Sequence, residues 1–210
     1  MERLKKLYGE TNMSWPVVLL FAVIAGVYTA AVNMIPLFNG TSFQDIAISH
    51  EWWVIFAVIV VVNCHAGWEA MLKCFVFFAI SQPIVFLVQV AFGYMTMDMG
   101  MYYLRNWVPM IILTLPGGFI AYFCKKQNVG GSIVLGLGNT IELVLGISYL
   151  LAAIRNFPYH ILTTVVCFVS IFVMTFCIQK EKKNRVVALL TCVCVTAVLL
   201  VLLKMTGRTL

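Results

Sequence analysis

One acidic residue, Glu142, stands near the middle of a long apolar segment of the sequence, residues 130–154. A carboxylate at the centre of a bilayer costs at least about 2.5–3.5 kcal/mol, so this side chain is expected to face protein or water. No lysine, arginine or histidine lies at a comparable depth in another apolar segment. We therefore expect Glu142 to be protonated or to meet a cation that comes from outside the chain. The alternative is a neutral, structural glutamic acid that hydrogen-bonds a neighbouring helix.

Four amide side chains are placed to line a pocket together with Glu142. Asn139 lies three residues before it, on the same face of a helix. Gln82 and Gln89 are seven residues apart and also share one helical face. Asn33 ends a stripe of small and polar residues in the first apolar segment. We predict a binding site formed by Glu142, Asn139, Gln82, Gln89 and Asn33, although such amides also simply bridge helices, at about 0.6 kcal/mol each.

A second pair of residues has the chemistry of a nucleophile and its base. His65 and Cys74 are nine residues apart and flank an expected tight turn. A cysteine beside a histidine can act as a thiolate nucleophile, so an intramembrane peptide-processing enzyme is an alternative function. A packed cysteine and an interfacial histidine explain the pair more simply, because catalysis needs defined geometry and a third, orienting group. Cys192 and Cys194, which are two residues apart, would point to different faces of a helix and so indicate no metal pair. No cofactor is expected.

The composition requires that membrane helices position these side chains. The chain of 210 residues is 62% hydrophobic and 10% charged, against about 45–50% and about 25% in soluble domains. So few charged residues cannot cover a soluble surface, and so hydrophobic a chain is not disordered. A transmembrane β-barrel would show alternating segments of about 10 residues, whereas the apolar runs here are longer and do not alternate. The fold class is therefore an all-α polytopic membrane protein.

Seven apolar segments come close to the length of about 20 residues that a helix needs to cross a bilayer. We predict one seven-helix transmembrane domain at 15–204, a basic cytoplasmic segment at 1–14 and a short outer tail at 205–210. The second span is the weakest, because the stretch without charge is short. The predicted spans are Trp15–Pro36, Trp52–Gly67, Met71–Tyr94, Asn106–Cys124, Gly130–Ile154, Pro158–Ile178 and Val186–Leu203.

The basic residues predict the orientation, because they concentrate in cytoplasmic loops. With seven spans and a cytoplasmic N-terminus, the C-terminus lies outside, and ten of the fourteen lysines and arginines lie on the inner side. The net charge of +6 then fits anionic lipid of the inner leaflet, without a nucleic-acid partner. The inner residues are Arg3, Lys5, Lys6, Lys73, Lys125, Lys126, Lys180, Lys182, Lys183 and Arg185, and the outer ones are Arg105, Arg155, Lys204 and Arg208.

These observations favour a transport or small-ligand-binding protein of the cell membrane. Its intramembrane carboxylate site would take a proton, a cation or a neutral polar metabolite, since an anion would require buried arginine or lysine. The expected partners are the lipid bilayer, a small-molecule or ion ligand, and further copies of the chain or the subunits of a larger permease. A non-catalytic interaction or immunity protein, in which the polar stripes only join helices, is the remaining alternative.

Overall fold

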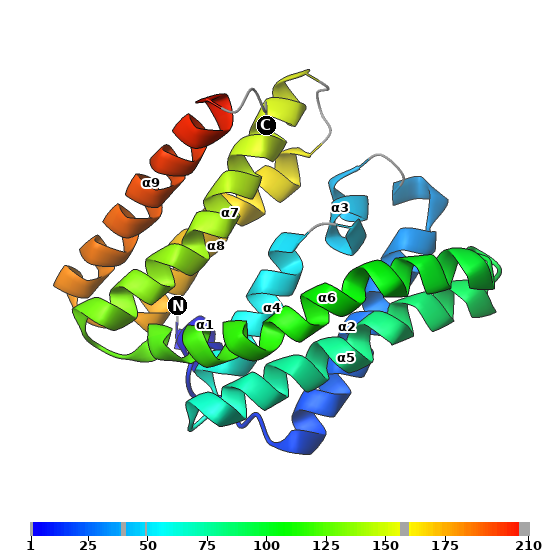
Figure 1. The fold of residues 1–210 in the computed structure, drawn as a ribbon, viewed down its shortest axis with the longest axis horizontal. Coiled ribbons are helices and arrows are strands. Elements are labelled where there is room, and N and C mark those ends of the chain that lie inside the picture. The colour runs from blue at the N-terminus through cyan, green and yellow to red at the C-terminus, as the bar shows by residue number, and fades with distance from the viewer. Residues whose placement is uncertain (1, 39–40, 49, 156–159, 206–210) are drawn as a thin grey trace. The chain divides into compact units, whose positions relative to one another are not determined.

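The computed structural model describes residues 2–38, 41–48, 50–155 and 160–205, and all regular secondary structure within them is helical. Six helices of this described part are long and apolar enough to cross a membrane (Figure 1). The all-α, multi-pass character is thus confirmed. These helices are α2 (Trp15–Met34), α5 (Gly67–Ala91), α6 (Met97–Ala121, extended by the 3-10 helix η2, Tyr122–Lys125), α7 (Val129–Arg155), α8 (Ile161–Ile178) and α9 (Lys182–Met205).

The second predicted span, Trp52–Gly67, is not confirmed as a complete crossing. The structure has a shorter helix there, α4 (His50–Val62), whose 13 residues extend about 20 Å, against a hydrocarbon core of about 30 Å. The predicted span was longer than α4 because it continued through the turn after Val62 to Gly67, which is already the first residue of the next helix. The start of the sixth predicted span and most of the outer tail lie outside the described residues. The other short elements are α1 (Glu2–Leu7), η1 (Pro36–Phe38) and α3 (Ser42–Ile48).

The chain divides into two compact units. Unit 1 consists of Met1–Gly9 and Phe123–Leu210, and unit 2 consists of Glu10–Tyr122. The prediction of a single seven-helix domain stays a prediction.

In unit 2, α2 and α5 run parallel. Near their starts the Lys73 ammonium donates to the carbonyl oxygen of Met13 at 2.5 Å. Further along both helices, a Cβ atom on Gly26 would lie only 2.8 Å from the carbonyl oxygen of Ser81. Because α2 and α5 are parallel, the chain between them must return to the end at which α2 began.

The segment of α3 and α4 makes this return. Asn63, directly after α4, accepts a hydrogen bond from the Thr11 backbone N–H at 2.8 Å, so α4 ends where α2 begins. The return is visible in Figure 1, where α4 leads back from α3 toward the start of α5. The polypeptide therefore travels the length of α2 and comes back before α5 starts.

The core of unit 2 is aromatic and lies between α2, α4 and α5. The Phe77 ring is fully buried, and its centroid is 5.0 Å from that of Phe21, 6.2 Å from that of Trp53 and 6.4 Å from that of Phe56. Such ring pairs contribute about 0.5–1.5 kcal/mol each beyond the area that they bury. They hold the short α4 against two long helices.

In unit 1, α7 contacts one antiparallel helix, α8, and one parallel helix, α9. Gly146 faces Cys167 of α8, where an added Cβ would lie 3.0 Å from the cysteine Cβ. Gly136 faces α9, and an added Cβ there would lie 2.6 Å from the Ala188 carbonyl oxygen. The short helix α1 packs on α8. Glycines thus let three helices approach closely, as is typical of membrane proteins.

This close approach predicts that Gly136→Ala destabilises the protein. The new methyl group would also lie 2.6 Å from Thr191 Cβ, and such overpacking costs about 1–3 kcal/mol. Gly138 on the same helix has nothing within 4 Å of an added Cβ, so Gly138→Ala is the matched control. Unfolding in mixed detergent micelles measures both. Equal stability of the two variants would contradict the close α7–α9 contact.

Candidate functional site

Glu142 lies in a polar layer between α7 and α8 of unit 1, and its side chain is 0% exposed. Ser170 Oγ lies 3.1 Å from Glu142 Oε2 and 2.8 Å from the carbonyl oxygen of Cys167. A hydroxyl has one proton to donate and can also accept. When Glu142 is ionised, Ser170 donates to the carboxylate. When Glu142 is protonated, the acid can donate to Ser170, whose own proton then goes to the Cys167 carbonyl. The same geometry therefore accommodates both protonation states.

Asn139 adds a second acceptor to this layer, one helical turn from Glu142. Its side chain is fully buried, and Nδ2 donates to Thr175 Oγ1 at 2.9 Å. Its Oδ1 has no hydrogen-bond partner among the described residues. A buried, unsatisfied acceptor costs about 1–3 kcal/mol, so a water, an ion or a ligand that donates is expected there.

Tyr8 is a residue of this unit that the sequence analysis missed, because the segment 1–14 was expected to be a solvated basic tail. Its side chain is only 7% exposed. Burial, with smaller electrostatic contributions from Cys177 and Glu142, raises the pKa of Tyr8 to about 12. Tyr8 therefore keeps its proton at physiological pH. It stays an O–H donor, close enough to the Glu142 carboxyl for the two groups to interact electrostatically.

The other predicted site residues belong to unit 2. Gln82 and Gln89 are both buried on α5, at 0% and 3% exposure, and Asn33 is half-buried near the end of α2. The structure thus brings Glu142 together with Asn139, and it places Gln82 and Gln89 on a helix of the other unit. One pocket that contains all five residues stays a prediction.

Unit 2 contains a partly buried ion pair that the sequence analysis missed. Lys73 was expected only as a basic residue at the inner edge, but it is 4% exposed and pairs with Glu69 four residues earlier. Glu69 Oε2 also accepts from the backbone N–H groups of His65, at 2.7 Å, and Ala66, at 3.3 Å. The pair therefore caps the first turn of α5, and the Met13 carbonyl takes a further proton of the ammonium. The i,i+4 spacing of acid and base could have indicated it.

The geometry of Cys74 and His65 does not favour a nucleophilic site. Cys74 is 3% exposed on α5, and a Cβ on Gly118 of α6 would lie 3.0 Å from its own Cβ. His65 is exposed in the turn before α5. Reactive cysteines lie in partly exposed, electropositive surroundings, whereas buried ones are inert. Among the residues that the structure describes, no group of three or more histidine, cysteine, aspartate or glutamate side chains could hold a metal ion.

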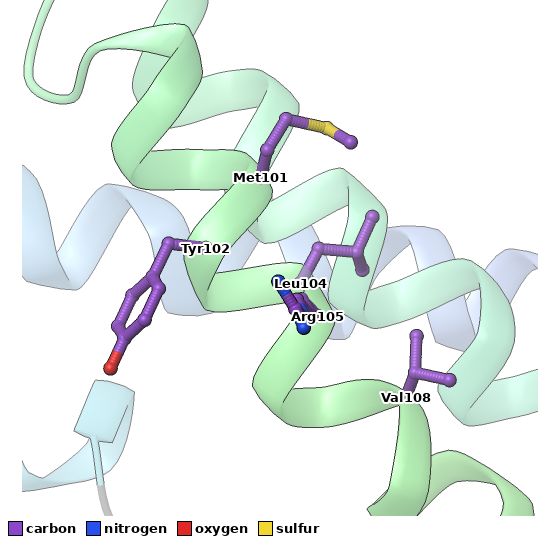
Figure 2. Close-up of a pocket in the computed structure, with 5 residues that line it drawn as sticks. All are labelled: Met101, Tyr102, Leu104, Arg105 and Val108. Atoms are coloured by element: carbon purple, nitrogen blue, oxygen red, sulfur yellow. The ribbon is translucent and has the colours of Figure 1, made fainter.

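A surface pocket of about 530 Å³ lies on α6 in unit 2. Figure 2 shows the five side chains that line it, all of which project from this one helix. No predicted site residue is among them. The lining residues are Met101, Tyr102, Leu104, Arg105 and Val108.

The chain matches no protein-family model, no curated protein and no solved structure.

Proposed function

We propose that the protein is an integral membrane transport or small-ligand-binding protein whose ligand site is the α7–α8 layer of unit 1, centred on Glu142. The observation that carries the proposal is the fully buried carboxyl beside Ser170, whose hydroxyl can reverse its donor direction. A carboxyl that is merely structural needs one fixed partner. A carboxyl that gains and loses a proton or a cation needs surroundings that serve both states, and this geometry supplies them.

The neighbours of Glu142 narrow the class of ligand. The Asn139 Oδ1 acceptor has no hydrogen-bond partner among the described residues, and it lies on the same face of α7 as the carboxyl. Two neighbouring acceptors suit a proton, a cation or a metabolite that donates hydrogen bonds. They disfavour an anion, because an anion seeks donors.

A cation-jump experiment tests this proposal. Proteoliposomes on a solid-supported membrane would receive jumps in proton, sodium, potassium and methylammonium concentration, with protein-free liposomes as background. We expect a protein-dependent current for at least one of these ions. Asn139→Leu should reduce it about tenfold through the loss of one acceptor. Ser148→Ala should leave the current unchanged, since the Ser148 hydroxyl donates to the Val144 carbonyl oxygen within α7. If no probe gives a protein-dependent current, a cation or proton transporter is excluded.

We further propose that α3 and α4 together make the seventh crossing, which their return between the parallel helices α2 and α5 supports. Seven residues in α3 and 13 in α4 give 20 helical residues, close to the number that a crossing requires. Alkaline phosphatase fusions that end at Phe38 and at Ala66 test this proposal. Activity at Phe38 and none at Ala66 is the expected result, whereas activity at both sites would show that the segment does not cross.

The charge distribution of unit 1 supports the proposed orientation in the cell membrane. At one end of the unit α7 and α9 begin and α8 ends, and six basic residues lie just before α7, just after α8 or in the first turn of α9. Arg155 and Lys204 lie at the opposite ends of α7 and α9. Basic residues favour the cytoplasmic side, so α9 would end outside. The six basic residues are Lys125, Lys126, Lys180, Lys182, Lys183 and Arg185.

A phosphatase fusion at Met205 is accordingly expected to be active, and one at Gln127 inactive. Three long helices separate the two positions, so the reporters should lie on opposite sides of the membrane. The reverse pattern of activity would contradict the orientation.

A further inference from the structure

Five side chains from α4, α5 and α6 of unit 2 form a closed ring of contacts, here called the aromatic–amide ring. Trp53 packs against Phe78, with centroids 5.7 Å apart, and against Trp107 at 6.3 Å. Trp107 packs against Tyr103 at 6.1 Å, and the Tyr103 hydroxyl lies 3.1 Å from Gln82 Oε1. Gln82 closes the ring, because it follows Phe78 by one turn on the same face of α5.

The hydrogen bonds of the aromatic–amide ring leave donors unused. The Trp107 side chain hydrogen-bonds the Tyr103 hydroxyl. An indole N–H can only donate, so Tyr103 accepts there and gives its own proton to Gln82 Oε1. This bond fixes the Gln82 amide with Nε2 as the unused group. Both Gln82 Nε2 and Trp53 Nε1 lack a hydrogen-bond partner among the described residues, although these side chains are 0% and 3% exposed.

Both unused groups can donate but not accept, which is the opposite of the Asn139 oxygen in unit 1. Natural proteins satisfy nearly all buried polar groups, so each exception calls for an absent acceptor. Four of the five members of the aromatic–amide ring are aromatic side chains, which favour contact with another flat ring. The five members of the aromatic–amide ring include no charged side chain that would recognise an ionic ligand.

We propose that the aromatic–amide ring is a second binding site, specific for a neutral, planar ring molecule that carries carbonyl or ring-nitrogen acceptors. Gln82 Nε2 and Trp53 Nε1 donate to the acceptors of the ligand, and the aromatic side chains stack on the flat ring of the ligand. The site lies wholly within unit 2, and it is independent of the carboxyl site proposed for unit 1.

Menadione, a small neutral quinone with two carbonyl acceptors, is a suitable probe because bound quinones quench tryptophan fluorescence. Titration of the full chain in nanodiscs should give saturable quenching. Trp53→Phe keeps an aromatic side chain but removes the indole N–H, and Gln82→Leu keeps the approximate shape of the side chain but removes the amide. Each variant should bind about tenfold more weakly, as expected for the loss of one hydrogen bond to a buried acceptor. Trp68→Phe, at a 61% exposed position outside the ring, is the matched control and should bind like the wild type.

A second arm uses only the wild-type protein, so it does not depend on whether a variant folds. 2-Methylnaphthalene has the same fused rings as menadione but no acceptor, and it should fail to displace bound menadione at tenfold excess. Equal displacement by the hydrocarbon, or unchanged affinity in folded Trp53→Phe and Gln82→Leu proteins, would overturn the proposal. Quenching that does not saturate would also overturn it and would leave ordered water as the acceptor.

Discussion

Glu142→Gln is expected to remove the cation-dependent current of the proteoliposomes, with a fall of about 10- to 100-fold for the lost interaction with a charged partner. Glutamine has nearly the same shape, and its amide can still hydrogen-bond Ser170, so the packing between α7 and α8 should survive. It cannot release a proton or neutralise a cation. The variant therefore separates the charge of this side chain from its structural contacts.

Two further variants make the result specific. Glu142→Asp keeps the carboxyl but withdraws it by one methylene group, and it should retain part of the current. Glu181→Gln removes an acid from the exposed connection between α8 and α9 and should leave the current unchanged. If Glu142→Gln conducts like the wild type while folding normally, the carboxyl is structural and the proposed function of unit 1 is wrong.

Lys73→Met is expected to lower the free energy of unfolding by about 1.5–3 kcal/mol, because it removes a buried ammonium that bonds both the Glu69 carboxylate and the Met13 carbonyl oxygen. The Lys73 and Glu69 side chains are 5% and 16% exposed. Without the ammonium, the partly exposed Glu69 carboxylate keeps only its two backbone N–H donors, and the Met13 carbonyl loses a donor. Unfolding in mixed detergent micelles, followed by tryptophan fluorescence, measures the change.

The double variant Lys73→Met with Glu69→Gln should recover much of this loss, since it leaves no uncompensated charge. Lys183→Met, at an exposed position, should change stability by at most about 0.5 kcal/mol. A loss that is equally large in the double variant would mean that the packing of Lys73, rather than its charge, stabilises the start of α5.

Hydropathy predicted the long helices because each must bury its backbone polar groups within one apolar segment. Their ends were less predictable. The fourth span was expected to begin at Asn106, yet α6 begins at Met97, because Asp98 and Arg105 lower the hydropathy without interrupting the helix. The opposite error occurred at α4, where an uncharged turn at residues 63–66 and the first residue of the next helix extended the predicted span.

Only those site residues that lie on the same helix could be predicted to lie together. The spacing of Asn139 and Glu142 placed both on one face of α7, and the structure has them in one layer. Helical periodicity contains no information about which helix packs against which, so the placement of Gln82 in the other unit could not be foreseen. Tyr8 was missed for a related reason, since a single aromatic residue in a basic segment has no pattern that shows it is buried.

Residues 2–9 pack with helices that the ribosome makes last. Residues 10–122, which are 113 positions, separate this segment from the rest of unit 1. Cys177 follows Tyr8 by 169 positions, so at about 5–20 residues per second the Tyr8 side chain waits about 8–34 s for this neighbour. A nascent chain that stalls before α8 therefore still exposes this tyrosine. Protection of the Tyr8 segment from proteases therefore indicates that synthesis of the chain has reached the last helices.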